Sequence, residues 1–188
     1  MGAITTIEDQ LIATTQGLFG NTLRTVDTVP GAVTLAVLKN MIASAPAVYF
    51  LFLGGQAVKE NEATINGRFT AYIVSRNRRG PKERRRGGAV EIGIYEILEH
   101  LVPQINGLTV PEVGSLKLTR IDNLFSVRLE EQLGAALYAA VFELPNLTLD
   151  IETDPSSLDN FITFNADHDL DLSGDGEPVA TDTLTLHQ

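Results

Sequence analysis

Apolar residues early in the chain recur at helical spacing: Ile7, Leu11, Ile12 and Leu18. This spacing predicts a helix over residues 5–18. Thr5 and Glu8 match a capping box, in which each side chain accepts a hydrogen bond from a free backbone N–H of the first turn. Gly17 and the Gly20-Asn21 pair indicate the end of this helix.

The next segment predicts a short strand followed by a short helix. The strand covers residues 23–29 and ends at Pro30 and Gly31. The helix is expected to end before Pro46, because proline disfavours the helical conformation in the residue before it. The apolar positions of this helix are Val33, Leu35, Ala36, Leu38 and Met41.

Two adjacent strands form the centre of the predicted sheet. Residues 47–53 are apolar throughout and lie between Pro46 and the Gly54-Gly55 pair, which is typical of a strand buried on both faces. Residues 68–75 alternate between two faces, with Phe69, Ala71 and Ile73 opposite to Thr70, Tyr72 and Val74. We expect the two strands to form a hairpin.

A third helix and three further strands are predicted downstream. The Gly87-Gly88 pair opens a helix over residues 89–102, and Pro103 and Gly107 terminate it. Its buried stripe consists of Ile94, Ile97, Leu98 and Leu101. The strands cover residues 116–121, 125–129 and 135–144, and the alternating pattern weakens near Pro145. Together the elements predict an α/β (α+β) fold, with a mixed, mostly antiparallel β-sheet flanked by about three helices.

Residues 150–188 differ from the rest of the chain in composition. They are rich in Asp, Ser, Gly and Thr, and their apolar residues form isolated islands. We therefore predict two regions, a domain of residues 1–149 and an extended acidic C-terminal arm of residues 150–188 that orders only on assembly. The candidate anchors of this arm are Leu158, Phe161, Ile162 and Phe164.

Charge is distributed unevenly along the chain. The formal net charge of −10 combines 14 Lys and Arg with 24 Asp and Glu. All 14 basic residues lie at or before Arg128, together with 11 acidic residues, so the remaining 60 residues hold 13 acidic residues and no basic one. Such a dipolar layout favours a docking or self-associating protein over a uniformly acidic enzyme.

Half of the basic residues fall within residues 76–86, which we call the arginine segment. Clustered guanidinium groups bind phosphates and carboxylates with bidentate geometry. Docking on an acidic protein surface is one interpretation, and a merely solvated loop is another. Nucleic-acid binding is a third, although the segment has no aromatic residue to stack on a base. The candidate partner-binding residues are Arg76, Arg78, Arg79, Lys82, Arg84, Arg85 and Arg86.

Patterns that would carry catalysis or hold a cofactor are missing or incomplete. The chain has no Cys and three His, and it lacks the nucleophile-elbow, P-loop, H-E-x-x-H and dinucleotide patterns. The acidic run 169–177 resembles the start of a calcium loop, but Ala180 stands where the bidentate Glu belongs. His100 is interpreted as a favourable cation near the end of its helix. We expect no enzyme activity, no metal and no cofactor.

The order of segments resembles the Mu-like phage tail terminator (tail completion) family over essentially the whole chain. The segments that carry the resemblance are residues 7–12, 23–27, 46–50, 68–74, 77–80, 84–87, 167–170 and 182–186. His168 stands where the family pattern has an aromatic residue.

The resemblance implies a structural virion protein rather than a catalyst. It implies a hexameric ring that caps the tail tube and sheath of a contractile tail, terminates polymerisation and presents the head–tail joining surface. The partners would be further copies of the chain, the tail tube protein, the sheath and the head–tail connector, with no membrane and no sequence-specific nucleic acid. The location would be the head-proximal end of the tail, reached from the host cytoplasm during assembly.

Two alternative functions remain open at this level. A head-completion or connector protein is also a ring-forming virion component. A nucleic-acid-binding module would use the arginine segment. The position of the protein in the particle separates the first alternative from a terminator, and DNA binding at physiological salt tests the second.

Overall fold

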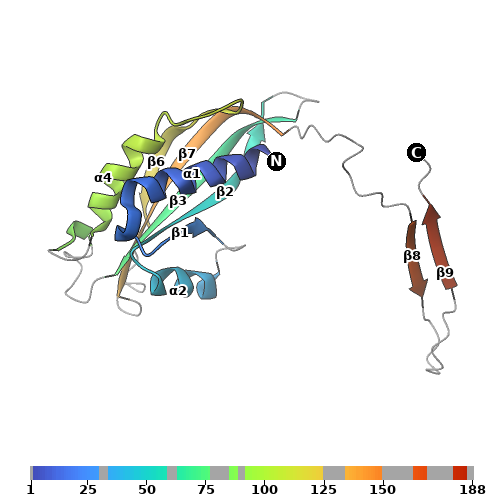
Figure 1. Cartoon of the computed structure of the whole chain (residues 1–188), viewed down its shortest axis with the longest axis horizontal. Coiled ribbons are helices and arrows are strands. Elements are labelled where there is room, and N and C mark those ends of the chain that lie inside the picture. The colour runs from blue at the N-terminus through green and yellow to red at the C-terminus, as the bar shows by residue number, and fades with distance from the viewer. Residues whose placement is uncertain are drawn as a thin grey trace, which may run out of the picture. The chain divides into compact units, whose positions relative to one another are not determined.

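The computed structural model describes residues 2–29, 34–58, 63–76, 85–88, 92–124 and 134–149, and it describes residues 163–168 and 180–185 by their backbone alone. The chain divides into two compact units, residues 1–151 and residues 152–188. Figure 1 shows the helices and strands with their labels.

A five-stranded mixed sheet forms the centre of the first unit, in the order β1-β2-β3-β7-β6. Only β1 and β2 pair in parallel, and the three other pairings are antiparallel. The bounds are Thr25–Thr28 for β1, Ala47–Ala57 for β2, Thr64–Arg76 for β3, Lys117–Asn123 for β6 and Ala135–Thr148 for β7. The predicted hairpin of the two central strands is confirmed as β2 and β3.

Helices α1 (Ala3–Phe19) and α4 (Ile94–Ile105) cover one face of this sheet (Figure 1). Their fully buried residues include Ile7, Leu11, Ile97 and Leu101, which belong to the same apolar cluster as Phe50, Phe69 and Phe142 of the sheet. A buried phenylalanine or leucine of this kind contributes about 2–3 kcal/mol relative to an exposed one. This cluster is the main core of the protein.

Helix α2 (Leu35–Ala43) packs on the opposite face. Its Met41 and Ile42 join a second cluster with Ala47, Tyr49 and Val74. The alternation predicted for residues 68–75 is therefore confirmed, because Phe69, Ala71 and Ile73 enter the first cluster and Val74 enters the second. With three α-helices among the described residues and a mostly antiparallel sheet, the predicted fold class is confirmed.

The predicted capping box is wrong. Helix α1 begins at Ala3, its N-cap is Gly2, and no side chain caps it. Thr5 lies inside the helix, and the Glu8 Oε1 atom instead accepts a hydrogen bond from the backbone N–H of Phe52 at 3.2 Å. The carboxylate of Glu8, which the local sequence pattern assigned to the helix, thus binds a backbone N–H of strand β2.

Two glycines and two prolines that were predicted to interrupt elements lie inside them. Strand β2 continues through Gly54 and Gly55 with a register shift, since Gly54 adopts a φ of 84° and a side chain at Gly55 would collide with the carbonyl of Asn66. Pro103 lies within α4, whose buried Ile105 extends the apolar stripe by a further turn. Pro145 lies within β7, which continues to Thr148.

Two further predicted elements have different bounds in the structure, and a third lies outside the described residues. The third helix begins at Ile94 rather than at residue 89, and residues 92 and 93 are not helical. Strand β1 is shorter than predicted at both ends. The predicted strand 125–129 lies outside the described residues.

The second unit contains one antiparallel pair of strands, β8 (Thr163–His168) and β9 (Ala180–Thr185). We call this pair the C-terminal ribbon. The apolar islands of the sequence gave no indication of paired strands. The ribbon forms a two-stranded sheet of its own, separate from the five-stranded sheet of the first unit.

Candidate assembly surfaces

The described part of the arginine segment flanks one end of the sheet. Arg76 is the last residue of β3 and pairs in register with Ala135, the first residue of β7. Arg85 and Arg86 are exposed and precede α4. The other candidate residues of the segment, Arg78, Arg79, Lys82 and Arg84, lie outside the described residues.

Close backbone packing holds the end of the arginine segment against the start of α4. A side chain at Gly93, the N-cap of α4, would collide with the backbone of Arg86 and Gly87. Gly87 adopts a φ of 80°, a conformation that other residues rarely adopt. The two glycines therefore fix where Arg85 and Arg86 leave the fold.

A pair of tyrosines lies close to Arg85. The rings of Tyr95 on α4 and Tyr138 on β7 pack edge to face with centroids 6.1 Å apart. Burial and a hydrogen bond with Tyr95 raise the pKa of Tyr138, and the positive charge of Arg85 opposes this shift. Partly exposed tyrosines beside an arginine are typical of the residues that contribute most to protein interfaces. Sequence reasoning missed this pair, because nothing in the spacing of a helix and a distant strand shows that the two rings meet.

Strand β6 forms one edge of the sheet, and β7 is the one described strand that pairs with it. The start of β6 is covered on its outer side, since the Leu118 N–H donates to Asn106 Oδ1 at 2.9 Å and the Leu116 N–H donates to the carbonyl of Leu108 at 3.0 Å. A register shift between Leu118 and Arg120 follows. We call residues 119–122, beyond this shift, the open edge.

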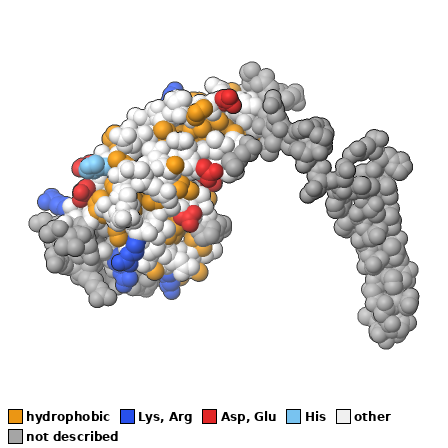
Figure 2. All heavy atoms as spheres, in the orientation of Figure 1, with side chains coloured by type: hydrophobic (Ala, Val, Ile, Leu, Met, Phe, Trp, Pro, Cys, Tyr) orange, Lys and Arg blue, Asp and Glu red, His pale blue; other side chains and the backbone are white. Residues whose placement is uncertain are grey.

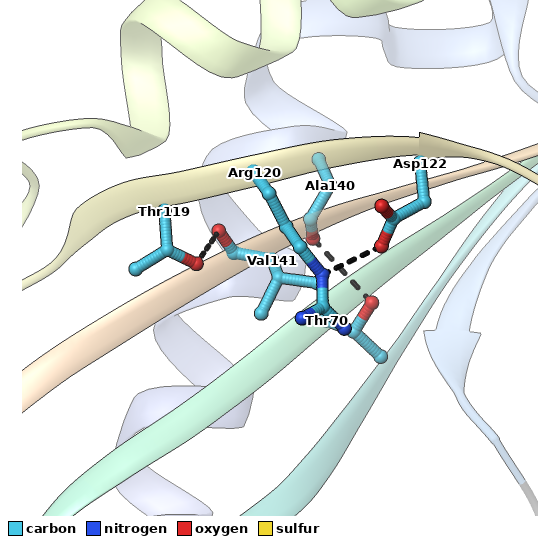
Figure 3. A network of polar contacts seen from close by, with 6 residues as sticks. All are labelled: Thr70, Thr119, Arg120, Asp122, Ala140 and Val141. Atoms are coloured by element: carbon cyan, nitrogen blue, oxygen red, sulfur yellow. Dashed lines mark hydrogen bonds and ion pairs between the residues drawn. The ribbon is translucent and has the colours of Figure 1, made fainter.

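Polar contacts shape the open edge (Figure 3). Thr119 Oγ1 donates to the carbonyl of Val141 on β7 at 2.9 Å, and Arg120 Nε donates to Asp122 Oδ2 at 2.7 Å. The ion pair is largely exposed and therefore contributes about 0–1 kcal/mol. The side chains of Ile121 and Leu124 beside it are exposed as well, with 44% of Ile121 accessible to solvent.

At the opposite edge, near β1, two carboxylates accept hydrogen bonds from outward N–H groups. Asp27 Oδ1 accepts a hydrogen bond from the Thr28 N–H at 2.7 Å. Beyond the end of β1, Glu8 covers the next outward N–H of β2, that of Phe52. Burial raises the pKa of Glu8, and the hydrogen bond from Phe52 partly offsets this shift. Short strands and charged side chains are common means of protecting a sheet edge.

The described surface gives no sign of a catalytic or metal centre. Among the described residues, no group of three or more His, Asp or Glu is placed to hold a metal ion. The ring of His100 forms a hydrogen bond with the carbonyl of Glu96 at 2.7 Å and packs against the ring of Phe19. Because α4 ends at Ile105 rather than at residue 102, His100 lies about one turn further from the C-terminal end of the helix than predicted. On the face drawn in Figure 2, charged side chains stand in small separate groups with hydrophobic side chains between them.

Comparison with known proteins identifies the family. The model of the family described as "Bacteriophage Mu, Gp37" matches residues 3–147. The chain belongs to this family. The match ends within β7, so it covers the first unit of this Gp37-family protein and stops before the C-terminal ribbon.

Two relatives of this Gp37-family protein extend the comparison. The "Mu-like prophage FluMu protein gp37" of Haemophilus influenzae is 30% identical over 172 residues, which cover 90% of this chain and 84% of the relative. The "Probable tail terminator protein" of Escherichia phage Mu is 28% identical over 159 residues, which cover 82% of this chain and 80% of the relative. The Gp37-family protein is therefore a structural phage tail protein and not an enzyme.

A solved chain in the "Virion of native gene transfer agent (GTA) particle" is also similar. It has a TM-score of 0.41 and 14% identity, and the similarity covers 74% of this chain and 91% of that chain. At this score the similarity carries no argument about function.

Several sequence-based predictions about the Gp37-family protein fall outside the described side chains. Leu158, Phe161 and Ile162 lie outside the described residues, and Phe164 is placed by its backbone in β8. The calcium-like run 169–177 also lies outside them. In the part of the chain that the structure describes, no helix is long and apolar enough to span a membrane.

Proposed function

We propose that this Gp37-family protein caps the end of a phage tail tube, terminates its polymerisation and presents the surface that joins the tail to the head. The relationship to the probable tail terminator of phage Mu supports this function most strongly, because the match covers 82% of this chain and 80% of that protein. The chain would act at the head-proximal end of the tail and reach it from the host cytoplasm during assembly.

The physical requirements of a terminator agree with the fold. A terminator must match the tube end on one face and lack the next tube-binding face on the other, and neither task needs a catalytic residue. We further propose a hexameric ring. A ring forms when one surface of each copy binds a different surface of the next copy and the rotation closes. The different treatment of the two sheet edges provides such unlike surfaces.

The arginine segment is proposed as the contact with the tube. Its seven basic residues and one acidic residue give a net charge of +6, and the described Arg85 and Arg86 are exposed beside the tyrosine pair. An acidic rim on the tube end would bind them through bidentate guanidinium contacts. The arm of residues 150–188, with Leu158, Phe161, Ile162 and Phe164 as anchors, is proposed to contact a neighbouring subunit or the sheath of a contractile tail.

The capping function is tested by polymerising purified tail tube protein with increasing amounts of this chain. We expect the tubes to shorten as the chain is added, and gold-labelled chain to sit at one end of each tube. Replacement of Arg84, Arg85 and Arg86 by Glu should remove the shortening. Arg85 and Arg86 are exposed in the structure, so the thermal unfolding of the variant should match that of the wild type.

Other outcomes assign the protein elsewhere. Tubes of unchanged length, together with binding of the chain to a head connector, would favour a head-completion protein. Unchanged tubes and DNA binding at physiological salt would favour the nucleic-acid module. A variant with Glu at all three positions that still shortens tubes would exclude the arginine segment as the tube contact.

A further inference from the structure

Four arginines gather at one end of the five-stranded sheet. The backbone N–H of Arg24 donates to the carbonyl of Pro46 at 2.8 Å, directly before β2 begins. Because β2 and β3 are antiparallel, the start of β2 lies beside the end of β3, which is Arg76. Arg85 and Arg86 precede α4, and Arg85 lies close to the tyrosine pair near the start of β7. All four side chains are exposed, and we call them the basic end.

Acidic residues do not neutralise the basic end. Asp27 is the acidic residue of β1, and Glu96 is the acidic residue in the first turn of α4. Asp122, near the end of β6, pairs with Arg120. The four arginines therefore outnumber the two acidic residues of the adjoining elements, so the described part of this end keeps a net positive charge.

The C-terminal arm carries the complementary charge. Residues 163–182, which we call the acidic stretch, contain six acidic residues, one His and no Lys or Arg. The acidic residues are Asp167, Asp169, Asp171, Asp175, Glu177 and Asp182. The C-terminal ribbon within this stretch is a two-stranded sheet of its own, and such a ribbon is only marginally stable in water. Because guanidinium groups bind carboxylates with bidentate geometry, clustered arginines are a fitting partner for this stretch.

The course of the chain favours a basic end on a different copy. Strand β7 begins at Ala135 beside Arg76, and its other end, Thr148, pairs with Thr64. Its 14 residues span about 45 Å, so the arm leaves the sheet at the end remote from the basic end. The spacer of residues 149–162 covers about 50 Å only when fully extended. A contact within one copy would therefore need an almost fully stretched spacer, which the loss of chain entropy opposes.

We propose that the acidic stretch of one copy binds the basic end of a second copy. The inference rests on the proposed function, which requires copies to associate and assigns the arm to a neighbouring subunit. It deepens that function by naming the surface that receives the arm. The acidic rim of the tube, proposed above as the partner of Arg85 and Arg86, would compete with the arm for this surface.

An exchange of charges between the two partners tests the proposal in full-length chains. The end variant carries three substitutions, Arg24→Glu, Arg76→Glu and Arg86→Glu. The arm variant carries four, Asp167→Lys, Asp169→Lys, Asp171→Lys and Asp175→Lys. The matched control reverses three exposed basic residues outside the basic end, with Lys39→Glu, Arg68→Glu and Lys117→Glu. Sedimentation velocity measures association, and thermal unfolding checks that each variant is folded.

We expect each exchanged variant alone to associate about 10-fold more weakly than the wild type, because like charges meet at the contact. An equimolar mixture of the two variants should regain the association of the wild type, since every contact again joins opposite charges. A chain that carries both exchanges should also associate with itself like the wild type. The control should associate like the wild type, and added salt should weaken the association of all associating chains.

Several results would overturn the proposal. One is a mixture that stays dissociated although both variants unfold like the wild type, and another is a control that weakens association as much as the end variant. Unchanged association of either exchanged variant, or a wild-type chain that stays monomeric at high concentration, overturns it as well. Monomeric wild-type chains that bind duplex DNA through the basic end would assign this surface to nucleic acid instead.

Tube shortening by the wild-type chain separates this inference from the proposed function. If the wild type shortens tubes but the mixed variants do not regain association, the inference alone fails. If the mixed variants regain association but the wild type leaves tube length unchanged, the capping function alone fails.

Discussion

The two edges of the central sheet are protected to different extents. At the β1 edge the strand has four residues, and the carboxylates of Asp27 and Glu8 accept the hydrogen bonds of Thr28 and Phe52. At the β6 edge the hydrogen bond to Asn106 covers Leu118, and Ile121 beyond it is exposed. In the part of the chain that the structure describes, the two edges are therefore protected by different groups.

Because of this difference, the two sides of a single copy are unlike. A protein with two open edges would add strands on both sides and risk open-ended aggregation. Two edges that are protected by different groups offer unlike surfaces for contacts between copies. Such unlike contacts generate a closed ring when the rotation per copy closes. The asymmetry of the edges therefore supports a directional assembly more than a symmetric dimer.

Removal of the C-terminal arm should have the largest effect. A chain that ends at residue 151 should lose self-association, because the arm that is proposed to contact a neighbouring subunit is gone. Its thermal unfolding should match that of the first unit in the full chain, since residues 1–151 form a compact unit with their own core. Sedimentation velocity and thermal melts provide the two readouts. Intact assembly of the shortened chain would show that the ribbon is not the contact.

A charge on the exposed edge strand β6 should weaken assembly by a smaller amount. Ile121→Glu replaces an exposed apolar side chain by a carboxylate, and we expect about 10–100-fold weaker association between copies, equivalent to about 1.4–2.8 kcal/mol. Leu35→Glu on α2 is the matched control, because 62% of Leu35 is exposed and the helix is remote in sequence from β6. Sedimentation equilibrium measures both. Equal weakening by the two variants would mean that net charge, rather than the open edge, controls assembly.

Loss of a carboxylate at the β1 edge should have a modest effect. Asp27→Ala removes the acceptor for the Thr28 N–H and should lower the free energy of unfolding by about 0.5–1 kcal/mol. It should also increase non-specific association, which light scattering detects. Asp27→Asn keeps an acceptor oxygen at the same place and should behave like the wild type. If Asp27→Ala remains as monodisperse as the wild type, this carboxylate does not protect the edge.

The smallest effect is expected at Glu8 and depends on pH. Because burial raises its pKa, the folded state holds the proton more strongly than the unfolded state. This group therefore adds stability as the pH falls from neutral through its folded pKa, and that gain is absent at neutral pH. Glu8→Gln is neutral at every pH and retains an acceptor for Phe52. It should be at least as stable as the wild type at pH 7, with the difference shrinking toward pH 4 in denaturant titrations. A less stable variant at pH 7 would contradict this account.

The sequence predicted the sheet centre and its faces well because those features follow from periodicity. Residues 47–53 and 68–75 have strand patterns strong enough to determine both burial and pairing. Where local rules failed, a tertiary contact had replaced a local one. Glu8 caps a strand rather than its helix, and Gly55 allows close backbone approach rather than ending its strand.

The candidate surfaces were predictable in part. The arginine segment is evident from composition, and the structure adds that Gly93 and Gly87 fix its end beside Tyr95 and Tyr138. The open edge was not predictable, because the exposure of one strand depends on the order of all the strands in the sheet. The C-terminal ribbon was also missed, since its polar and apolar residues alternate too weakly over six residues to predict a strand.

Electron microscopy of particles made by a phage that lacks this gene tests the central claim most directly. The account predicts tails of uncontrolled length that are not joined to heads, and normal tails when the gene is supplied in trans. Tails of normal length with unattached or leaking heads would contradict tail termination and assign the protein to the head side. Fully normal virions would exclude both roles.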